Sequence, residues 1–180
     1  MRVTAIHMHP KENNMTTQTF TLQPIGSVEA DTTGFTLKID EAYREGLLGL
    51  DQFSHVIVFW WGDQSDTEQA RATLTEKLYY ADDIEAGVFA CRTPNRPNPV
   101  LMTVCAILHI DAVAGTIVVP YLDAEDGTPI IDLKPYIGMS DRVKTLTPSS
   151  WFQGWPQWIA EKEGDMPDWV MAKLMNIPDA

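Results

Sequence analysis

A chain of 180 residues with 44% hydrophobic residues is long enough to bury one substantial core, so we expect a single main domain. Its formal net charge of −12 argues against DNA as a partner and against a broad nucleic-acid-binding face, because such a face needs surplus Lys and Arg. A small local basic patch stays possible. No apolar run is long enough to predict a membrane span, and two cysteines in apolar runs are typical of free thiols in a reducing cytoplasm.

The composition divides the chain into three parts. Residues 1–19 are polar with little periodicity, so we expect a flexible N-terminal arm. Residues 20–140 carry the strand-like runs and form the predicted main domain. Residues 141–180 place tryptophans among helix-forming residues, which predicts a helical tail packed on the body or on a partner subunit. The tryptophans of this tail are Trp151, Trp155, Trp158 and Trp169.

The first half of the main domain begins with a predicted hairpin. Residues 20–25 and 34–39 alternate apolar and polar side chains, with a short polar turn at 29–33. A short helix over residues 43–48, capped by Asp40, follows. Residues 53–61 form the most apolar run and predict a buried strand. A longer helix, capped by Ser65 or Asp66, is expected to continue to about Tyr80.

The second half of the main domain is predicted to be rich in strands. Residues 87–92 predict one strand, 100–111 and 116–122 a hairpin, and 130–136 a final short strand. Strands outnumber helices, and several strands are adjacent in hairpins. The predicted fold class is therefore mainly β, a closed antiparallel or mixed β-barrel with peripheral helices and a C-terminal helical tail.

A loop rich in proline lies between two of these strands. Pro94, Pro97 and Pro99 fix the backbone and exclude a helix, because proline lacks an amide hydrogen and restricts the residue before it. Arg92 and Arg96 lie on the same stiff segment, where paired guanidinium donors can hold a carboxylate or phosphate. The alternative is a structural turn with solvated arginines.

Four polar clusters follow or precede predicted strands, so we expect them to meet at one rim. They lie at residues 63–65, 91–92, 96–98 and 122–128. They combine carboxylates suited to sugar hydroxyls, arginines suited to a carboxylate and amides suited to a base edge. Simple turn chemistry is the alternative for Asp123 and Asp126. No metal-ligand spacing and no Ser-His-Asp order is present, so no metal site is predicted.

Three segments in order resemble the TsaA-like (YaeB-like) family. Residues 87–99, GVFACRTPNRPNP, resemble its GVFATRSPxRPNPIG signature, and residues 122–136, LDAEDGTPIIDLKPY, resemble LDxxDGTPVLDIKPY. Residues 49–55, GLDQFSH, are similar to its GLEGFSH. The resemblance implies a β-barrel that binds S-adenosylmethionine, usually as a homodimer. It also implies a methyltransferase that acts on N6 of threonylcarbamoyl-adenosine beside the tRNA anticodon.

The resemblance also implies which residues form the site. Cofactor contacts carried over by position fall on Gln64, Ser65, Arg92, Met102, Pro120, Tyr121, Leu122 and Asp123. Arg92 suits the methionyl carboxylate of the cofactor, and Asp123 suits a ribose hydroxyl or the amine. Substrate contacts are predicted at Arg96, Asn98 and Lys134, and a general base, if one is needed, at Asp126 or His55.

The chain departs from the family pattern in three places. Val100 and Leu101 replace the Ile-Gly that ends the proline signature, and only the short turn at 29–33 stands where tRNA-modifying members carry a long loop. The tail is also shorter than their C-terminal extension. These departures keep two alternatives open: a methyltransferase for a small-molecule acceptor, and a non-catalytic module that binds S-adenosylmethionine.

Overall fold

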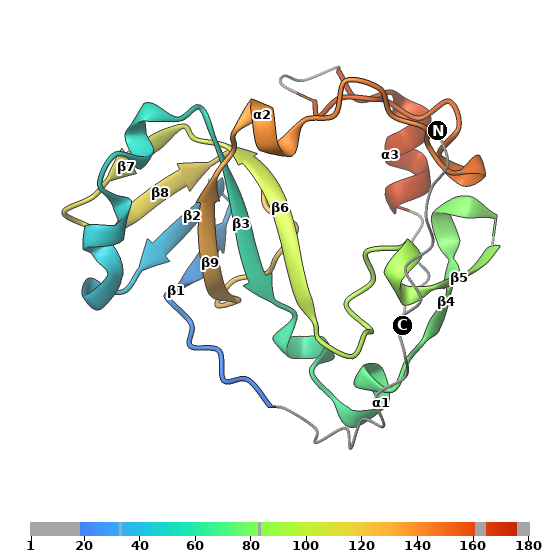
Figure 1. The fold of residues 1–180 in the computed structure, drawn as a ribbon, viewed down its shortest axis with the longest axis horizontal. Coiled ribbons are helices and arrows are strands. Elements are labelled where there is room, and N and C mark those ends of the chain that lie inside the picture. The colour runs from blue at the N-terminus through green and yellow to red at the C-terminus, as the bar shows by residue number, and fades with distance from the viewer. Residues whose placement is uncertain (1–18, 33, 83, 161–164, 176–180) are drawn as a thin grey trace, which may run out of the picture.

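The computed structural model describes residues 19–32, 34–82, 84–160 and 165–175; most of the predicted N-terminal arm, residues 1–18, lies outside them. The centre of the fold is a seven-stranded antiparallel sheet in the order β6-β3-β9-β1-β2-β8-β7 (Figure 1). Its strands are β1 (Gly26–Asp31), β2 (Gly34–Ile39), β3 (His55–Trp61), β6 (Val100–Ala106), β7 (His109–Asp111), β8 (Thr116–Val119) and β9 (Pro129–Pro135). The mainly β class predicted from the sequence is confirmed.

The prediction of a closed barrel is wrong. In the described part of the chain no ladder joins the edge strands β6 and β7, although they follow each other in sequence. The amide of Ile107 still donates to Ser54 O beside β3, whereas the amide of Leu108 donates to Val118 O on β8. The expected single strand over 100–111 therefore divides. The edge strands β6 and β7 are thus linked by the covalent chain, whereas a closed barrel would need backbone hydrogen bonds between two edge strands.

The core lies on the inner face of this sheet, where alternate side chains of the strands meet. Leu37, Val56, Val58, Ile117 and Ile130 are all fully buried. Because successive side chains of a strand point to opposite faces, the alternating runs in the sequence position these residues correctly. The same cluster includes Val28, Ile39, Leu47, Leu50, Trp60, Leu101, Cys105, Val119 and Leu122.

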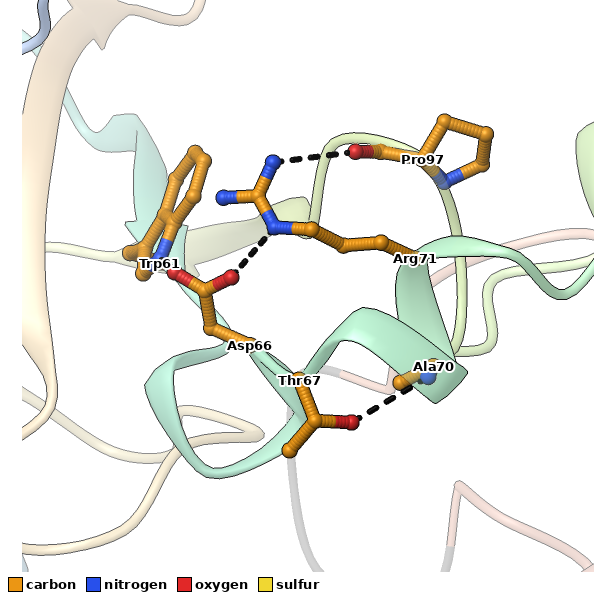
Figure 2. Close-up of polar contacts among 6 residues, drawn as sticks. All are labelled: Trp61, Asp66, Thr67, Ala70, Arg71 and Pro97. Carbon is orange, nitrogen blue, oxygen red and sulfur yellow. Dashed lines mark hydrogen bonds and ion pairs between the residues drawn. The ribbon is translucent and has the colours of Figure 1, made fainter.

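The long helix expected before Tyr80 is wrong in extent. Only α1 (Glu68–Arg71) forms, and its cap is Thr67, whose Oγ1 accepts from the amide of Ala70 (Figure 2). The chain then makes a separate hairpin of β4 (Thr75–Leu78) and β5 (Ile84–Gly87). Helix propensity is a weak preference, and here the hairpin wins because it buries Leu78 and Ala86 in a second apolar cluster.

Two predicted strands are displaced. The first strand begins at Gly26 instead of 20–25, since Pro24 cannot donate to a ladder and Phe20 is exposed. At Gly26 a Cβ would lie 2.0 Å from Lys38 O, so this close pairing with β2 requires glycine. The strand expected over 87–92 ends at Gly87, and residues 88–90 form a 3₁₀ turn.

The remaining helices are short, and the described part of the tail carries the 3₁₀ helix Ser150–Phe152 and the helix α3 (Asp168–Met175). The helix expected over 43–48 is the 3₁₀ helix Glu41–Leu47, and Asp40 makes no side-chain cap. α2 (Gly138–Asp141) follows β9, and the tail then crosses from the sheet to the β4–β5 hairpin, where α3 lies (Figure 1). Among the described residues no helix has the length and apolar character needed to cross a membrane.

Candidate functional site

β3 ends, and β6 and β9 begin, at the same end of the sheet, which we call the rim. Trp61, the last residue of β3, pairs with Val100, the first residue of β6, and Trp60 pairs with Ile130 near the start of β9. The segments after β3, before β6 and before β9 must therefore emerge together. The sequence analysis predicted this convergence, and the register confirms it for these three segments.

Two hydrogen bonds join the loops at this rim. The amide of Gly62 donates to Pro99 O at 2.8 Å, which ties the end of β3 to the proline loop. Gln64 Nε2 donates to Glu125 Oε2 at 2.5 Å, which ties the same segment to the acidic turn before β9. Glu125 was not predicted as a site residue, because it stands at a variable position of the LDxxDGTP signature.

Arg96 is the structural centre of the proline loop. Its guanidinium donates to Thr93 O at 2.6 Å, to Val88 O at 2.8 Å and to Cys91 O at 2.6 Å. Because of these contacts, residues 88–93 wrap around the half-buried side chain of Arg96. Most of the donor capacity of Arg96, predicted to bind substrate, is therefore directed at the protein's own backbone.

Arg92, on the same loop, is exposed, and among the described residues its guanidinium makes no hydrogen bond or ion pair. Its five N–H donors are thus available to a ligand. Of the two arginines on the stiff loop, Arg92 is the one free to bind a carboxylate.

The β4–β5 hairpin braces the proline loop through Glu76. The carboxylate of Glu76 accepts from Thr93 Oγ1 at 3.1 Å and from Asn95 Nδ2 at 3.4 Å. Thr93 Oγ1 in turn accepts from the amide of Asn95 at 3.2 Å. The role of Glu76 was not predicted, because the sequence around it favours a helix and the hairpin that carries it was missed.

α1 braces the other end of the loop through Arg71. Figure 2 shows its guanidinium between Asp66, which it contacts in an ion pair, and Pro97 O, to which it donates at 3.3 Å. Its Cζ also lies 5.4 Å from the ring centroid of Trp61, whose indole N–H donates to Asp66 at 2.9 Å. The hydrogen bonds from Arg71 and then Trp61 hold the pKa of Asp66 below its ordinary value.

Tyr121 and Asp123 form a polar pair after β8. Tyr121 Oη donates to Asp123 Oδ1 at 3.4 Å, and the Tyr121 ring packs edge-on against Phe35. Burial and then the charge of Asp123 raise the pKa of Tyr121, and the same two causes raise that of Tyr79 on the β4–β5 hairpin. Tyr79, which sequence reasoning missed, is thus sensitive to the charge of Asp123.

The other predicted cofactor positions differ in exposure. Leu122 is 1% exposed and belongs to the core. Met102 is half-buried on β6 opposite Phe59, and Pro120 is exposed. Ser65 is half-buried, and its amide donates to Gly62 O.

The two predicted general bases lie far apart. Asp126 is exposed at the rim, where its Oδ1 accepts from the amide of Ala30 at 3.0 Å. His55 begins β3, so it lies about 20 Å along the strand from the rim. Its Nδ1 lies 2.9 Å from Ser54 Oγ, and its ring lies beside Tyr136. The structure thus does not bring His55 together with the rim residues.

The predicted substrate residues Asn98 and Lys134 are both exposed. Asn98 lies at the rim, just before β6, whereas Lys134 lies along β9 opposite Ile57. Lys134 Nζ pairs with Asp132 at 2.5 Å and lies over the ring of Phe59. In the part of the chain that the structure describes, no three His, Cys, Asp or Glu side chains are grouped to hold a metal ion.

Comparisons with known proteins find relatives of this chain in sequence and in fold. A probable S-adenosyl-L-methionine-binding protein of Methanocaldococcus jannaschii is 38% identical over 116 residues, which cover 63% of this chain and 89% of that protein. The tRNA (adenine(37)-N6)-methyltransferase of Rattus norvegicus is 32% identical over 108 residues, 59% of this chain and 24% of that protein. The crystal structure of TrmO from Pseudomonas aeruginosa superposes with a TM-score of 0.59 at 25% identity.

That superposition covers 76% of this chain and 63% of the TrmO chain, so the chain spans less than two thirds of the length of that solved relative. The match to the tRNA-methyltransferase O N-terminal domain extends over residues 14–142, and it contains the sheet, the proline loop and the acidic turn. The chain belongs to the family of the tRNA-methyltransferase O N-terminal domain, which confirms the resemblance in its sequence.

Proposed function

We propose that the rim binds S-adenosylmethionine and that the chain transfers its methyl group to an acceptor. The observation that carries the proposal is the convergence of three strand ends, linked by the Gln64–Glu125 and Gly62–Pro99 hydrogen bonds. The family match and the relatives named as S-adenosyl-L-methionine-binding proteins support the choice of ligand.

The side chains at the rim fit the polar groups of this ligand. Arg92 offers unused donors for the methionyl carboxylate, and bidentate pairing of guanidinium with carboxylate is the strongest contact available there. Asp123, held by Tyr121, offers an acceptor for ribose hydroxyls or for the ammonium group. The ligand brings an activated methyl group on a positively charged sulfur. The chain contributes alignment, which can supply roughly 7 to 11 kcal/mol of a barrier.

Asp126 is the general base in this proposal, because it lies at the rim and His55 does not. Asp126→Asn keeps an oxygen that accepts from the amide of Ala30, so the fold should be retained. We expect methyl transfer to fall at least tenfold with S-adenosylmethionine affinity unchanged. An unchanged rate would remove Asp126 from the mechanism.

The acceptor we propose is the N6 position of a tRNA adenine near the anticodon, as in the name of the rat relative. The net charge of −12 favours a contact with few phosphates, through Asn98 and the two remaining N–H donors of Arg96. A small-molecule acceptor is the alternative, favoured by the same shortage of cations.

A binding module without turnover is the second candidate. It is favoured by the M. jannaschii relative, which resembles this chain over 89% of its own length and is named only for binding. Tight ligand binding with no methylated product would support it.

Calorimetric titration and nucleoside analysis separate these functions. We expect the wild-type chain to bind S-adenosylmethionine, Arg92→Ala to bind at least tenfold more weakly, and Arg142→Ala, an exposed arginine beyond β9, to bind like wild type. Mass spectrometry of tRNA nucleosides, incubated with and without the protein, then tests the acceptor. No binding at millimolar ligand would refute the proposed function.

We further propose that the chain works as a homodimer. Phe89 is 85% exposed and lies three residues before Arg92, where an unburied aromatic ring is typical of a surface that a partner covers. Light scattering should give a mass of two chains for wild type and of one chain for Phe89→Asp. A monomeric wild type would contradict this part of the proposal.

A further inference from the structure

A cavity lies between the tail and the β4–β5 hairpin, and its lining residues differ from the rim residues described above. Its volume is about 380 Å³, within the size range of small-molecule sites. Trp151, Trp155 and Trp169 line it, together with Asp82, Gln153 and Lys173. The tail follows the part of the chain that matches the family, so the match assigns no role to these tryptophans.

Aromatic packing holds the wall of this cavity in place. Trp155 packs edge-on against Trp169, with ring centroids 5.5 Å apart, and against Tyr80 at 6.0 Å. Phe152 stacks on Tyr80 at 5.5 Å. Lys173 Nζ links α3 to the hairpin by donating to Tyr80 O at 3.4 Å. The indole faces are therefore held in fixed positions, which lowers the entropy lost when a planar ring stacks on them.

Polar groups of both kinds surround these rings. Lys173 and Gln153 provide donors, whereas Asp82 and Gln153 provide acceptors. Lys173 Nζ and Asp82 Oδ1 lie 3.5 Å apart in an exposed ion pair, so a ligand would share these two groups with that pair. In the adjoining segment, Ser149 Oγ and the indole N–H of Trp151 are buried without a hydrogen-bond partner among the described residues. These two atoms have almost no accessible surface, so they belong to the wall behind the cavity and do not contact its interior.

We propose that this cavity binds a nucleobase, with its flat face on a tryptophan and its polar edge toward Asp82, Gln153 and Lys173. A planar ring that carries both donors and acceptors matches the lining, and base stacking on aromatic side chains is sequence-tolerant and substantial. The proposal does not depend on methyl transfer at the rim.

The base can come from a free nucleoside or from an unpaired position in RNA. Adenosine and a single-stranded oligoadenylate are therefore the two probes, titrated against tryptophan fluorescence without S-adenosylmethionine, because its own adenine would compete for the cavity. The tail variants below assign the quenching to this cavity and not to the rim. Ribose is the control without a base. We expect saturable quenching by adenosine and none by ribose. Much tighter binding of the oligonucleotide, weakened by salt, would identify RNA as the source, and equal binding a free nucleoside.

Trp169→Ala and Trp158→Ala are matched variants of the tail. Trp169 lines the cavity, whereas Trp158 is 73% exposed and is not among its lining residues. We expect Trp169→Ala to weaken adenosine binding about tenfold and Trp158→Ala to change it less than twofold. Gln153→Ala, an exposed lining residue, serves as a second test that does not depend on aromatic packing. No quenching by either probe, or equal affinities for all variants, would overturn the proposal.

Discussion

Arg92 and Arg96 lie four positions apart on one loop but have opposite surroundings. Arg96 donates to three backbone carbonyls, whereas Arg92 is exposed and has no hydrogen-bond partner among the described residues. The sequence placed both arginines at the site but could not rank them. The difference arises from the 3₁₀ turn at 88–90, which directs the carbonyls of Val88 and Cys91 toward Arg96.

This contrast predicts opposite phenotypes for two alanine substitutions. Arg96→Ala leaves three carbonyls without a charged donor and should lower the free energy of unfolding by about 2 kcal/mol or more. Arg92→Ala should change it by less than about 0.5 kcal/mol, while weakening ligand binding as proposed above. Urea unfolding followed by circular dichroism measures both. Equal destabilisation would mean that Arg92 also has a structural role.

The two cysteines should differ in reactivity. Both were predicted to be buried thiols, yet Cys91 is half-buried and only Cys105 is fully buried. Burial raises the pKa of Cys105 to about 12, so it stays protonated and unreactive at pH 8. Because the folded pKa is raised, any stability that it contributes should be lost as the pH rises from about 9 toward 12.

Alkylation with iodoacetamide at pH 8 checks this difference. Mass spectrometry of the folded protein should show one modification, at Cys91, and the urea-unfolded protein should show two. Rapid labelling of Cys105 in the folded protein would contradict its burial.

At the level of elements, α1 and the β4–β5 hairpin act as braces for the proline loop. Glu76 on β4 holds Thr93 and Asn95, and Arg71 on α1 holds Pro97. The sequence could not show this, because its Glu, Gln, Ala and Leu content favours a helix through the whole region. The hairpin forms because Leu78 and Ala86 become buried beneath the tail, which is a long-range contact that local propensity does not contain.

The brace predicts an effect at a distance from the ligand. Glu76→Ala should weaken S-adenosylmethionine binding about threefold to tenfold, because the loop that carries Arg92 becomes less rigid before binding. Glu85→Ala is the control, since Glu85 lies on the same hairpin and its carboxylate accepts from Thr75 Oγ1, with no contact to the proline loop among the described residues. Calorimetric titration of both variants with S-adenosylmethionine measures the two affinities. Identical affinities would show that the hairpin does not preorganise the loop.

At the scale of the whole molecule, the mainly β class and the convergence of strand ends were predicted correctly, whereas the predicted closure of the sheet into a barrel was wrong. Convergence follows from antiparallel order, which adjacent apolar runs and turns reveal. Closure of the sheet depends on how residues 100–111 pair with their neighbours. The change of hydrogen-bond partner between Ile107, which donates to Ser54 O, and Leu108, which donates to Val118 O, has no counterpart in the local sequence pattern. The surface on which the tail packs could not be predicted either, because the spacing of the tryptophans does not indicate which part of the chain they contact.

Hydrogen exchange with and without S-adenosylmethionine tests the central claim most directly. The account predicts slower amide exchange in three segments far apart in sequence, 62–65, 91–98 and 120–126, with little change at residues 53–56 around His55. Protection that is absent from all three segments at saturating ligand, or that lies only elsewhere, would contradict a common binding site at this rim.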